Sequence, residues 1–238
     1  MNIDPVEYWS QAARNGTVAR WTRNAQRKIT LRRATILLAR SLKRGLDIIG
    51  SIGAMCLFSP IFILTALLIK LEDGGPVFFR QQRVGAGGRL FGIWKFRSMV
   101  INADQIKDHL LQDNQHGQAG VTFKMKNDPR ITKVGKWIRK LSIDEFPQFY
   151  NVLHGDMSLV GPRPPVPREV ATYQASHLRR LRVKPGITCL WQIGGRADID
   201  FEGQVRLDLQ YIRSSSVLFD IVILLKTLPA VLFGKGAY

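Results

Sequence analysis

Two adjacent carboxylates, Asp144 and Glu145, are the residues of this sequence best suited to chemistry on a phosphoryl group. A carboxylate can attack phosphorus and form an acyl phosphate, which divides one difficult transfer into two easier ones. Carboxylate oxygens also bind Mg²⁺, which usually bridges to the phosphates of a substrate. The pair is therefore a candidate catalytic dyad and a candidate Mg²⁺ site.

The same pair has a purely structural interpretation. Ser142 stands three residues before Glu145, which matches a capping box at the start of a helix. The helix dipole favours acidic residues in the first turn. This local pattern alone favours the structural interpretation, so the catalytic one depends on the surrounding residues.

Arginines lie on both sides of the pair. Arg139 precedes it, and Arg163 follows it in the segment VGPRPPVP, residues 160–167. Arginine makes bidentate contacts with phosphate oxygens. The glycine and prolines predict a stiff loop that presents Arg163. The alternative for Arg163 is a solvated surface arginine.

A long apolar segment indicates where this chemistry takes place. Residues 48–69 form an uncharged run of 22 residues, which as a helix would extend about 33 Å, enough to cross the hydrocarbon core. A buried helix of a soluble protein is the alternative. Ser59 and Pro60 lie in the middle of the run, and proline kinks or breaks a helix, with Ser59 available to satisfy a freed carbonyl.

Basic residues flank this segment on both sides, and such flanks prefer the cytoplasm. The sequence therefore predicts a re-entrant helix-break-helix that enters the membrane and returns. A kinked spanning helix remains the other option, since spanning helices also tolerate proline.

Net charge and composition restrict the class of protein. The 238 residues include 35 Lys+Arg and 18 Asp+Glu, a net charge of +17, and 45% are hydrophobic. The apolar share excludes a disordered basic tail, and two cysteines exclude a disulfide scaffold. The charge predicts a polyanionic partner: nucleic acid, an anionic membrane surface or phosphorylated substrates. We expect no nucleic acid, because the aromatic residues are not interleaved with basic ones in a stacking pattern.

The pattern predicts a mainly helical α+β fold with a small globular domain and interfacial amphipathic helices. Residues 1–38 would be a basic arm, either partly disordered or continuing into an interfacial helix from Ile29. Residues 39–72 would be the membrane segment with its lead-in, and residues 73–238 a cytoplasmic catalytic domain. We expect no secretory signal at Met1, because no apolar core with a small-residue cleavage site starts near it.

Within the globular part, residues 74–99 alternate around a glycine-rich turn, which predicts a β-hairpin. Further predicted elements are helices at 99–115, 131–139 and 147–153 and a polar loop at 114–120. The apolar stretch 217–233 is interrupted by Asp220, Lys226 and Pro229, so we expect a surface-seeking helix rather than a spanning one.

Several long motifs occur in an order that is specific to one family. They cover nearly all of residues 39–238: KRGLDIIGSIG (43–53), the central Ser59-Pro60, GPVFFRQQRVG (75–85), WKFRSM (94–99), SIDEFPQFYNVLHGDMSLVGPRP (142–164), VKPGITCLWQIGGR (183–196) and GKGAY (234–238). In these motifs the chain resembles the bacterial sugar transferases, or monotopic phosphoglycosyl transferases. Those enzymes move a sugar 1-phosphate onto polyprenol phosphate and start exopolysaccharide, capsule and O-antigen assembly.

The resemblance implies a role for each matching residue. Asp144 corresponds to the nucleophile that forms a covalent phosphosugar beside Mg²⁺, and Glu145 to a partner that assists metal binding or proton handling. Arg139 corresponds to a phosphate-binding arginine. The segment Pro162-Arg163-Pro164 corresponds to the active-site wall near the nucleotide sugar, and Ser59-Pro60 to the break of the re-entrant helix. Further substrate-binding candidates within the motifs are Lys95, Arg97 and Gln192.

The activity that the resemblance implies joins a soluble donor to a lipid acceptor. UDP-hexose, with glucose or galactose as the sugar, and undecaprenyl phosphate would give undecaprenyl-diphosphate-hexose and UMP. The enzyme would lie at the cytoplasmic face of the bacterial inner membrane, with its basic arm on anionic lipids. Three residues depart from the usual family pattern: Cys189 stands in place of Gly, Gly194 in place of Ser and Ser215 in place of Trp. These departures bear on the sugar specificity and on the position in the membrane, and none of them affects the dyad.

Two other classes of function stay open at this stage. A membrane-anchored basic binding protein would account for the charge. A scaffold without activity would account for the family motifs, although the intact dyad and Arg139 argue against it. The sequence leaves the sugar and the oligomeric state open, a homodimer being one option. Cys56 and Cys189 are expected to be reduced and structural.

Overall fold

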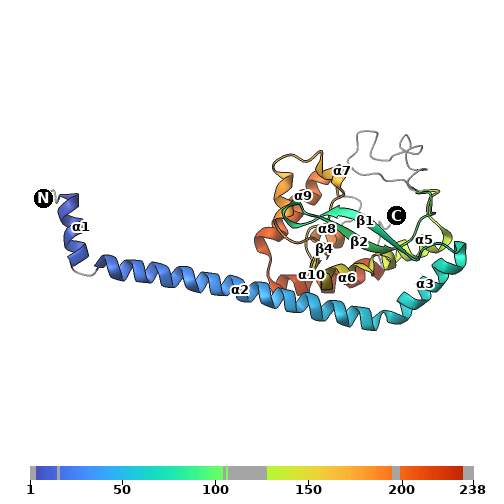
Figure 1. Ribbon diagram of the computed structural model, residues 1–238, viewed down its shortest axis with the longest axis horizontal. Helices are drawn as coiled ribbons and strands as arrows, with labels where there is room; N and C mark the ends of the chain where they lie inside the picture. Colours follow the sequence, from blue (N-terminus) through green and yellow to red (C-terminus); the bar gives the residue numbers. More distant parts are fainter. Residues whose placement is uncertain (1–3, 15–16, 104–105, 107–127, 195–198, 233–238) are drawn as a thin grey trace. The chain divides into compact units, whose positions relative to one another are not determined.

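The computed structural model describes residues 4–14, 17–103, 106, 128–194 and 199–232 and shows a mostly helical α+β structure (Figure 1). Its contacts divide the chain into two units, residues 1–44 and 45–238. In the first unit, helix α1 (Pro5–Arg14) precedes the start of helix α2 (Thr17–Leu57). The described part of the basic arm is therefore helical.

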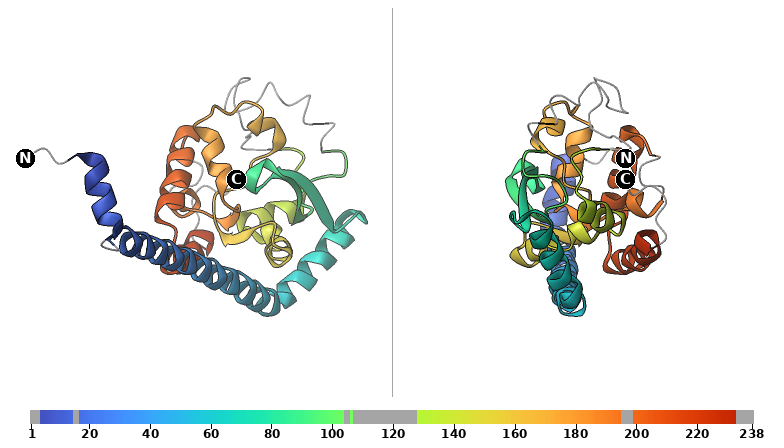
Figure 2. Two further views of the ribbon diagram at one scale, coloured as in Figure 1. Left: turned by 60° about the vertical axis from the view of Figure 1, so that its left-hand side comes forward. Right: turned by 90° about the vertical axis from the view of Figure 1, so that its right-hand side faces the viewer.

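The predicted helix break is confirmed in the second unit. Helix α2 ends at Leu57, helix α3 (Ser59–Asp73) follows, and the two are bent by 61° (Figures 1 and 2). Pro60 lies in the first turn of α3, where its missing N–H removes no helical hydrogen bond. The Ser59 hydroxyl donates to the Cys56 carbonyl at 2.8 Å, so it satisfies an acceptor that the break frees. Among the described helices none is long and apolar enough by itself to cross a membrane, but this bent pair meets that criterion together.

The predicted hairpin is also confirmed. Strands β1 (Phe78–Val84) and β2 (Leu90–Phe96) pair antiparallel along their whole length around the short turn η1 (Ala86–Gly88). Gly87 and Gly88 have φ angles of 68° and 81°, a left-handed conformation that side chains with a Cβ rarely adopt. The glycines of the turn thus allow the chain to reverse within a few residues.

The two short helices after the hairpin lie close to their predicted positions, as α5 (Lys133–Lys140) and α6 (Gln148–His154). The capping box between them is not formed, so that interpretation was wrong. Ser142 adopts a φ of 55° and its side chain makes no capping hydrogen bond. Instead, the dyad lies in a 3₁₀ turn, η3 (Ile143–Glu145), ahead of α6.

A buried amide fixes this region to the hairpin. Asn151 of α6 donates from Nδ2 to the Gly92 carbonyl at 2.8 Å and accepts from the Trp94 amide at 2.9 Å. Asn151 is 2% exposed, so both of these hydrogen bonds form away from water. They set the position of α6, and with it the dyad, relative to strand β2.

A short parallel pair of strands was not predicted. Strand β3 (Ser158–Val160) pairs with β4 (Gly186–Thr188). Between them lie a loop from Gly161, helix α7 (Pro167–Val170) and the 3₁₀ segment η4 (His177–Arg182). Three-residue strands are too short for a periodic pattern to identify them.

The chain continues through α8 (Leu190–Gly194), α9 (Phe201–Ser214) and α10 (Val217–Leu232), which supply part of the core together with β2, α6 and β3. Asp220 does not interrupt the apolar surface of α10 as the sequence suggested, because it is fully buried. The Tyr211 hydroxyl lies 2.8 Å from Asp220 Oδ1 and 3.0 Å from the Val160 carbonyl. The outer face of α10 exposes apolar side chains instead, among them Leu218 and Leu225. Of the predicted helix at 99–115, the structure describes residues 99–103 and 106. Met99 forms a β-bridge with Ile131, so a helix does not begin there, and the predicted loop at 114–120 lies outside the described residues.

An ion pair joins the end of α3 to the end of the hairpin. The Arg97 guanidinium donates to both carboxylate oxygens of Asp73 and to the Pro76 carbonyl. Arg97 is 7% exposed, whereas the Asp73 side chain is 32% exposed. The hydrogen bonds that Asp73 accepts from Arg97, and after them the one from the Gly75 amide, lower the pKa of Asp73 to about 2.

We expect Asp73→Asn to lower the stability of the protein by about 1 kcal/mol at neutral pH, a value reduced for solvent screening. Because the folded pKa of Asp73 lies below its usual value, the wild-type contribution is complete above about pH 4 and is lost as the pH falls towards 2. Thermal unfolding in detergent should therefore show a difference between variant and wild type that shrinks over this range. A difference that is independent of pH would contradict the ion-pair assignment.

Candidate active site

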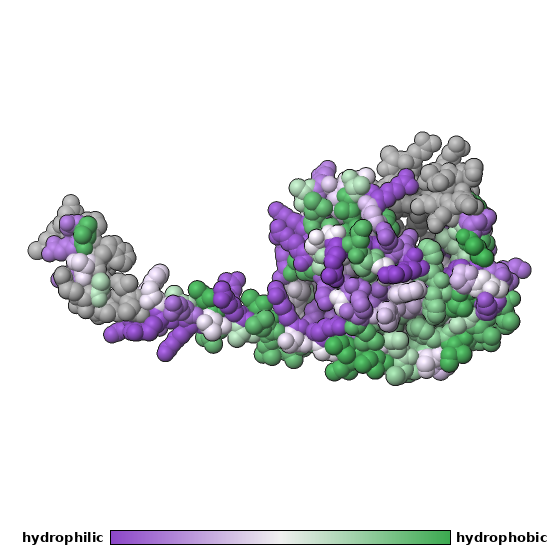
Figure 3. Space-filling view, viewed as in Figure 1, coloured by the Kyte–Doolittle hydropathy of each residue, from purple (hydrophilic) through white to green (hydrophobic). Residues whose placement is uncertain are grey.

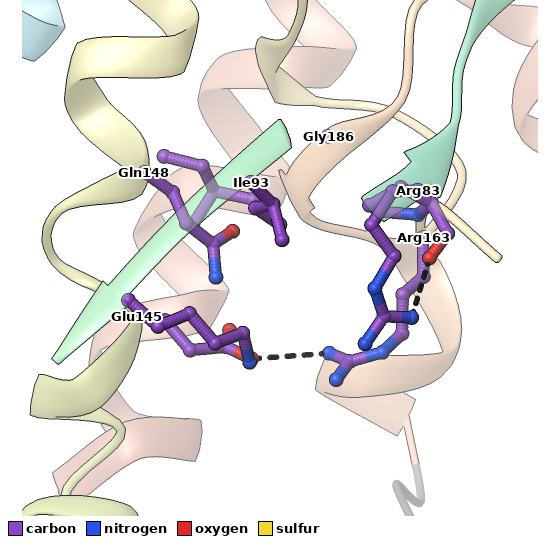
Figure 4. A pocket seen from close by; sticks show the side chains of 9 residues that line it. Arg83, Ile93, Glu145, Gln148, Arg163 and Gly186 are labelled. Atoms are coloured by element: carbon purple, nitrogen blue, oxygen red, sulfur yellow. Dashed lines mark hydrogen bonds and ion pairs between the residues drawn. The ribbon is translucent and has the colours of Figure 1, made fainter. Parts of the chain in front are cut away.

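One cavity collects polar side chains from five elements of the second unit (Figure 4). Strands β1 and β2 supply cations, η3 and α6 supply a carboxylate and an amide, and the loop after β3 supplies an arginine. Backbone from β4 closes one side. The lining residues are Arg83, Ile93, Lys95, Glu145, Gln148, Arg163, Pro164, Gly186 and Ile187.

Glu145 is the carboxylate at the centre of this cavity. Its Oε1 lies 3.0 Å from Lys95 Nζ and 3.4 Å from Arg163 Nη1. Figure 4 shows Glu145 and Arg163 pointing toward each other across the cavity. Lys95 Nζ also lies 3.9 Å from Oδ2 of Asp144, so this ammonium group stands between the two carboxylates.

The two carboxyl groups of the dyad have opposite pKa shifts. Burial raises the pKa of Asp144, although the nearby Lys95 opposes the shift. Burial also acts on Glu145, but Lys95 and Arg163 outweigh it and lower the pKa of Glu145 to about 2. Neighbouring acids whose pKa values are driven apart are suited to different tasks in one reaction.

Asp144 makes fewer and longer ion pairs than Glu145 within the described residues. Within the described part of the chain its carboxylate has one ion pair, the longer one to Lys95. It is 9% exposed. Arg139, in the last turn of α5, adds a further positive charge that acts on Asp144. The carboxylate of Asp144 is thus buried among cations without being held by a close partner among them.

A second arginine of the cavity, the half-buried Arg83, was not singled out from the sequence. Its Nη1 donates to the Pro164 carbonyl at 2.9 Å, and the guanidinium also donates to Gln81 Oε1. Burial, followed by the charge of Arg163, lowers the pKa of Arg83 to about 10. In the hairpin register Arg83 and Lys95 lie on the same face, so a period-two reading of the two strands could have placed them together.

The other predicted site residues have varied positions. Pro162 accepts a hydrogen bond from the Gly186 amide at 2.9 Å, which holds the loop beside β4. Gln192, in α8, accepts from the Cys189 thiol at 3.0 Å. Burial raises the pKa of that thiol, which keeps it protonated at neutral pH. Arg97 does not line the cavity, because its guanidinium is paired with Asp73.

The arrangement has a net positive charge around a carboxylate. Arg83, Lys95 and Arg163 outnumber the dyad, and the guanidinium of Arg163 lies 6.0 Å from the ring centre of Trp191. Such a set of cations compensates an anionic ligand with several oxygens. A buried carboxylate beside it can act as a nucleophile or a metal ligand.

Comparisons with known proteins agree with this arrangement. The model of the family described as bacterial sugar transferase matches residues 38–234. The chain is similar to galactosyl transferase CpsE of Streptococcus agalactiae, with 54% identity over 82% of this chain and 43% of that protein. It is also similar to exopolysaccharide production protein ExoY of Rhizobium meliloti, with 42% identity over 82% of this chain and 88% of ExoY.

A third relative is the undecaprenyl-phosphate galactose phosphotransferase of Salmonella typhimurium, with 46% identity over 84% of this chain and 42% of that protein. The chain therefore spans less than half of two of these relatives and most of ExoY. Because the family match covers residues 38–234, which include the helix bend and the cavity, the chain belongs to the bacterial sugar transferase family.

Proposed function

We propose that this protein transfers hexose 1-phosphate from a UDP-hexose to undecaprenyl phosphate and releases UMP. The product would start the assembly of an exopolysaccharide, capsule or O-antigen. The observation that carries the proposal is the dyad of a buried Asp144 and a half-buried Glu145 beside three cations from separate elements. The name of the Salmonella relative, an undecaprenyl-phosphate galactose phosphotransferase, supports the acceptor and the class of donor.

In the proposed reaction a carboxylate oxygen of Asp144 attacks the β-phosphorus of the donor. A bond from this phosphorus to Asp144 forms as its bond to the bridging oxygen breaks, and that oxygen leaves with UMP. An oxygen of undecaprenyl phosphate then attacks the same phosphorus and releases Asp144. Lys95, Arg163 and Arg83 would stabilise the negative charge that develops on the phosphate oxygens. The low pKa of Glu145 keeps it ionised, and through its ion pairs it holds Lys95 and Arg163 at the cavity.

The dyad also fits Mg²⁺ as a cofactor. Mg²⁺ is usually held by one or two carboxylates together with water and substrate phosphates. Asp144 and Glu145 provide two hard oxygen donors side by side, and the described residues contain no larger cluster of metal ligands. Bound there, Mg²⁺ would neutralise charge on the diphosphate. Asp144 and Glu145 are the residues that would hold it.

The surface of the bent pair supports a membrane location. Apolar side chains on both arms are exposed, including Ile49, Leu57, Ile63 and Leu71, each more than 70%. Figure 3 shows hydrophobic surface gathered around the end of α2 and along α3. A contiguous apolar surface of this kind indicates a lipid or protein contact. We propose that the pair enters one leaflet from the cytoplasmic face of the bacterial inner membrane and that flanking basic residues contact anionic lipids.

Asp144→Asn should abolish the transfer, because an amide cannot form the acyl phosphate. We expect UMP release to fall by at least about 10³-fold. The assay uses detergent-purified protein with Mg²⁺, undecaprenyl phosphate and either UDP-glucose or UDP-galactose. Asp156→Asn, outside the cavity lining, serves as the matched control and should keep wild-type turnover. Undiminished turnover in Asp144→Asn would exclude it as the nucleophile. No UMP from either donor with the wild type would favour a binding protein or an inactive scaffold.

Re-entry predicts that both flanks of the bent pair face the cytoplasm. Single cysteines would replace Lys28 and, separately, Arg89, after Cys56 and Cys189 are replaced by serine. A membrane-impermeant maleimide should label neither position in intact spheroplasts and both after permeabilisation. Labelling of one flank in intact spheroplasts would show a crossing and refute re-entry.

A further inference from the structure

Two parts of the candidate active site are attached to the bent helix pair: the turn that carries the dyad, and strand β3 with the Arg163 loop that follows it. Phe146 directly follows the dyad. Its ring lies 4.9 Å from that of Phe58, at the bend, and 5.9 Å from that of Phe62 in α3. The turn that carries Asp144 and Glu145 is therefore packed against the helix break.

Strand β3, which precedes the Arg163 loop, is attached to helix α2 by a buried carboxylate. Asp47 of α2 is 4% exposed, and its Oδ1 accepts from the Ser158 hydroxyl at 2.9 Å and from the Leu159 amide at 3.0 Å. Both donors belong to strand β3. Gly50, one turn further along α2, leaves room for the Leu159 side chain, because a Cβ there would lie 2.6 Å from Leu159 Cδ1. The helix thus contacts β3 directly.

Strand β3 leads straight into the loop that carries Arg163. On one side the Gly161 amide donates to the Thr188 carbonyl at 3.0 Å, in β4. On the other side the Val84 amide donates to the Pro165 carbonyl at 2.9 Å, in addition to the bond from Arg83 to Pro164. Arg163 lies between these attachments, four residues after Leu159. Its direction into the cavity depends on where β3 is held.

We infer that Asp47 is a positioning residue for the transfer reaction: it acts from the membrane helix, through β3, on the loop that aims Arg163 at the diphosphate. This rests on the proposed function. Both hydrogen bonds end on the same oxygen, so the role requires an acceptor at this position and not a negative charge. Asparagine keeps such an acceptor, whereas alanine leaves the Ser158 hydroxyl and Leu159 amide buried without it.

The test compares Asp47→Asn and Asp47→Ala with a matched control, Ser51→Ala. Ser51 is buried on the same helix, and its hydroxyl has no hydrogen-bond partner in the described structure. Two quantities are measured in detergent: hydrogen–deuterium exchange of residues 157–165, and kcat and KM for UMP release. Ser158→Ala, which removes one of the two donors, provides a milder variant if Asp47→Ala does not fold.

Asp47→Ala should speed exchange in residues 157–165 and lower kcat by roughly 10- to 100-fold, the scale expected from a small misplacement of a group that binds the transition state. Asp47→Asn should stay within about threefold of wild type, which a requirement for charge would not allow. Ser51→Ala should change neither quantity, and Ser158→Ala should change both in the direction of Asp47→Ala.

Unchanged exchange in Asp47→Ala, or faster exchange with unchanged kcat, would overturn the inference. Equal losses in Asp47→Asn and Asp47→Ala would overturn it as well, because the charge and not the acceptor would then matter. A wild-type protein that releases no UMP would contradict the proposed function, and the exchange data would still test the link between Asp47 and the loop.

Discussion

Two carboxylates can be buried side by side only if positive charge is buried with them, because each isolated carboxylate would lose several kcal/mol of solvation. In this protein the compensating cations are far apart in sequence. Lys95 ends a hairpin, Arg163 follows a short parallel strand, and both reach Glu145. The packing of hairpin, dyad turn and loop is therefore tied to the charge balance of the cavity. A movement of the hairpin or of the Arg163 loop would therefore change the pKa of Glu145.

The bent helix pair adds a second constraint, since it contacts both the turn that carries the candidate dyad and strand β3, which precedes the Arg163 loop. Aromatic packing at Phe58 joins the bend to the dyad turn, and Asp47 joins α2 to β3. The same helices expose apolar side chains on their other surface. A segment that meets lipid on one side and positions reacting groups on the other would keep the cavity near the plane where a lipid acceptor and a soluble donor can both arrive.

Much of this architecture could be predicted from sequence because its signals are local. Glycines marked the hairpin turn, and Ser59-Pro60 marked the helix break. Errors arose where local and long-range patterns conflict. Ser142 and Glu145 match a capping box, but the left-handed backbone at Ser142 prevents it. Asp220 reads as a break in an apolar stretch, yet the Tyr211 hydroxyl gives it a buried partner. Strand β3 could not be predicted, since it depends on pairing between distant segments. Arg83 was missed although the period-two pattern of the hairpin places it on the same face as Lys95.

The hydrogen bond from Ser59 to the Cys56 carbonyl has a consequence for the order of folding. The acceptor freed by the break is satisfied three residues away, so the bend needs no partner from later in the chain. The helix pair also precedes the hairpin, the dyad and the arginine loop in sequence. During synthesis the bend can therefore form before any residue of the candidate active site leaves the ribosome. The later segments can then fold against a helix bend that is already formed.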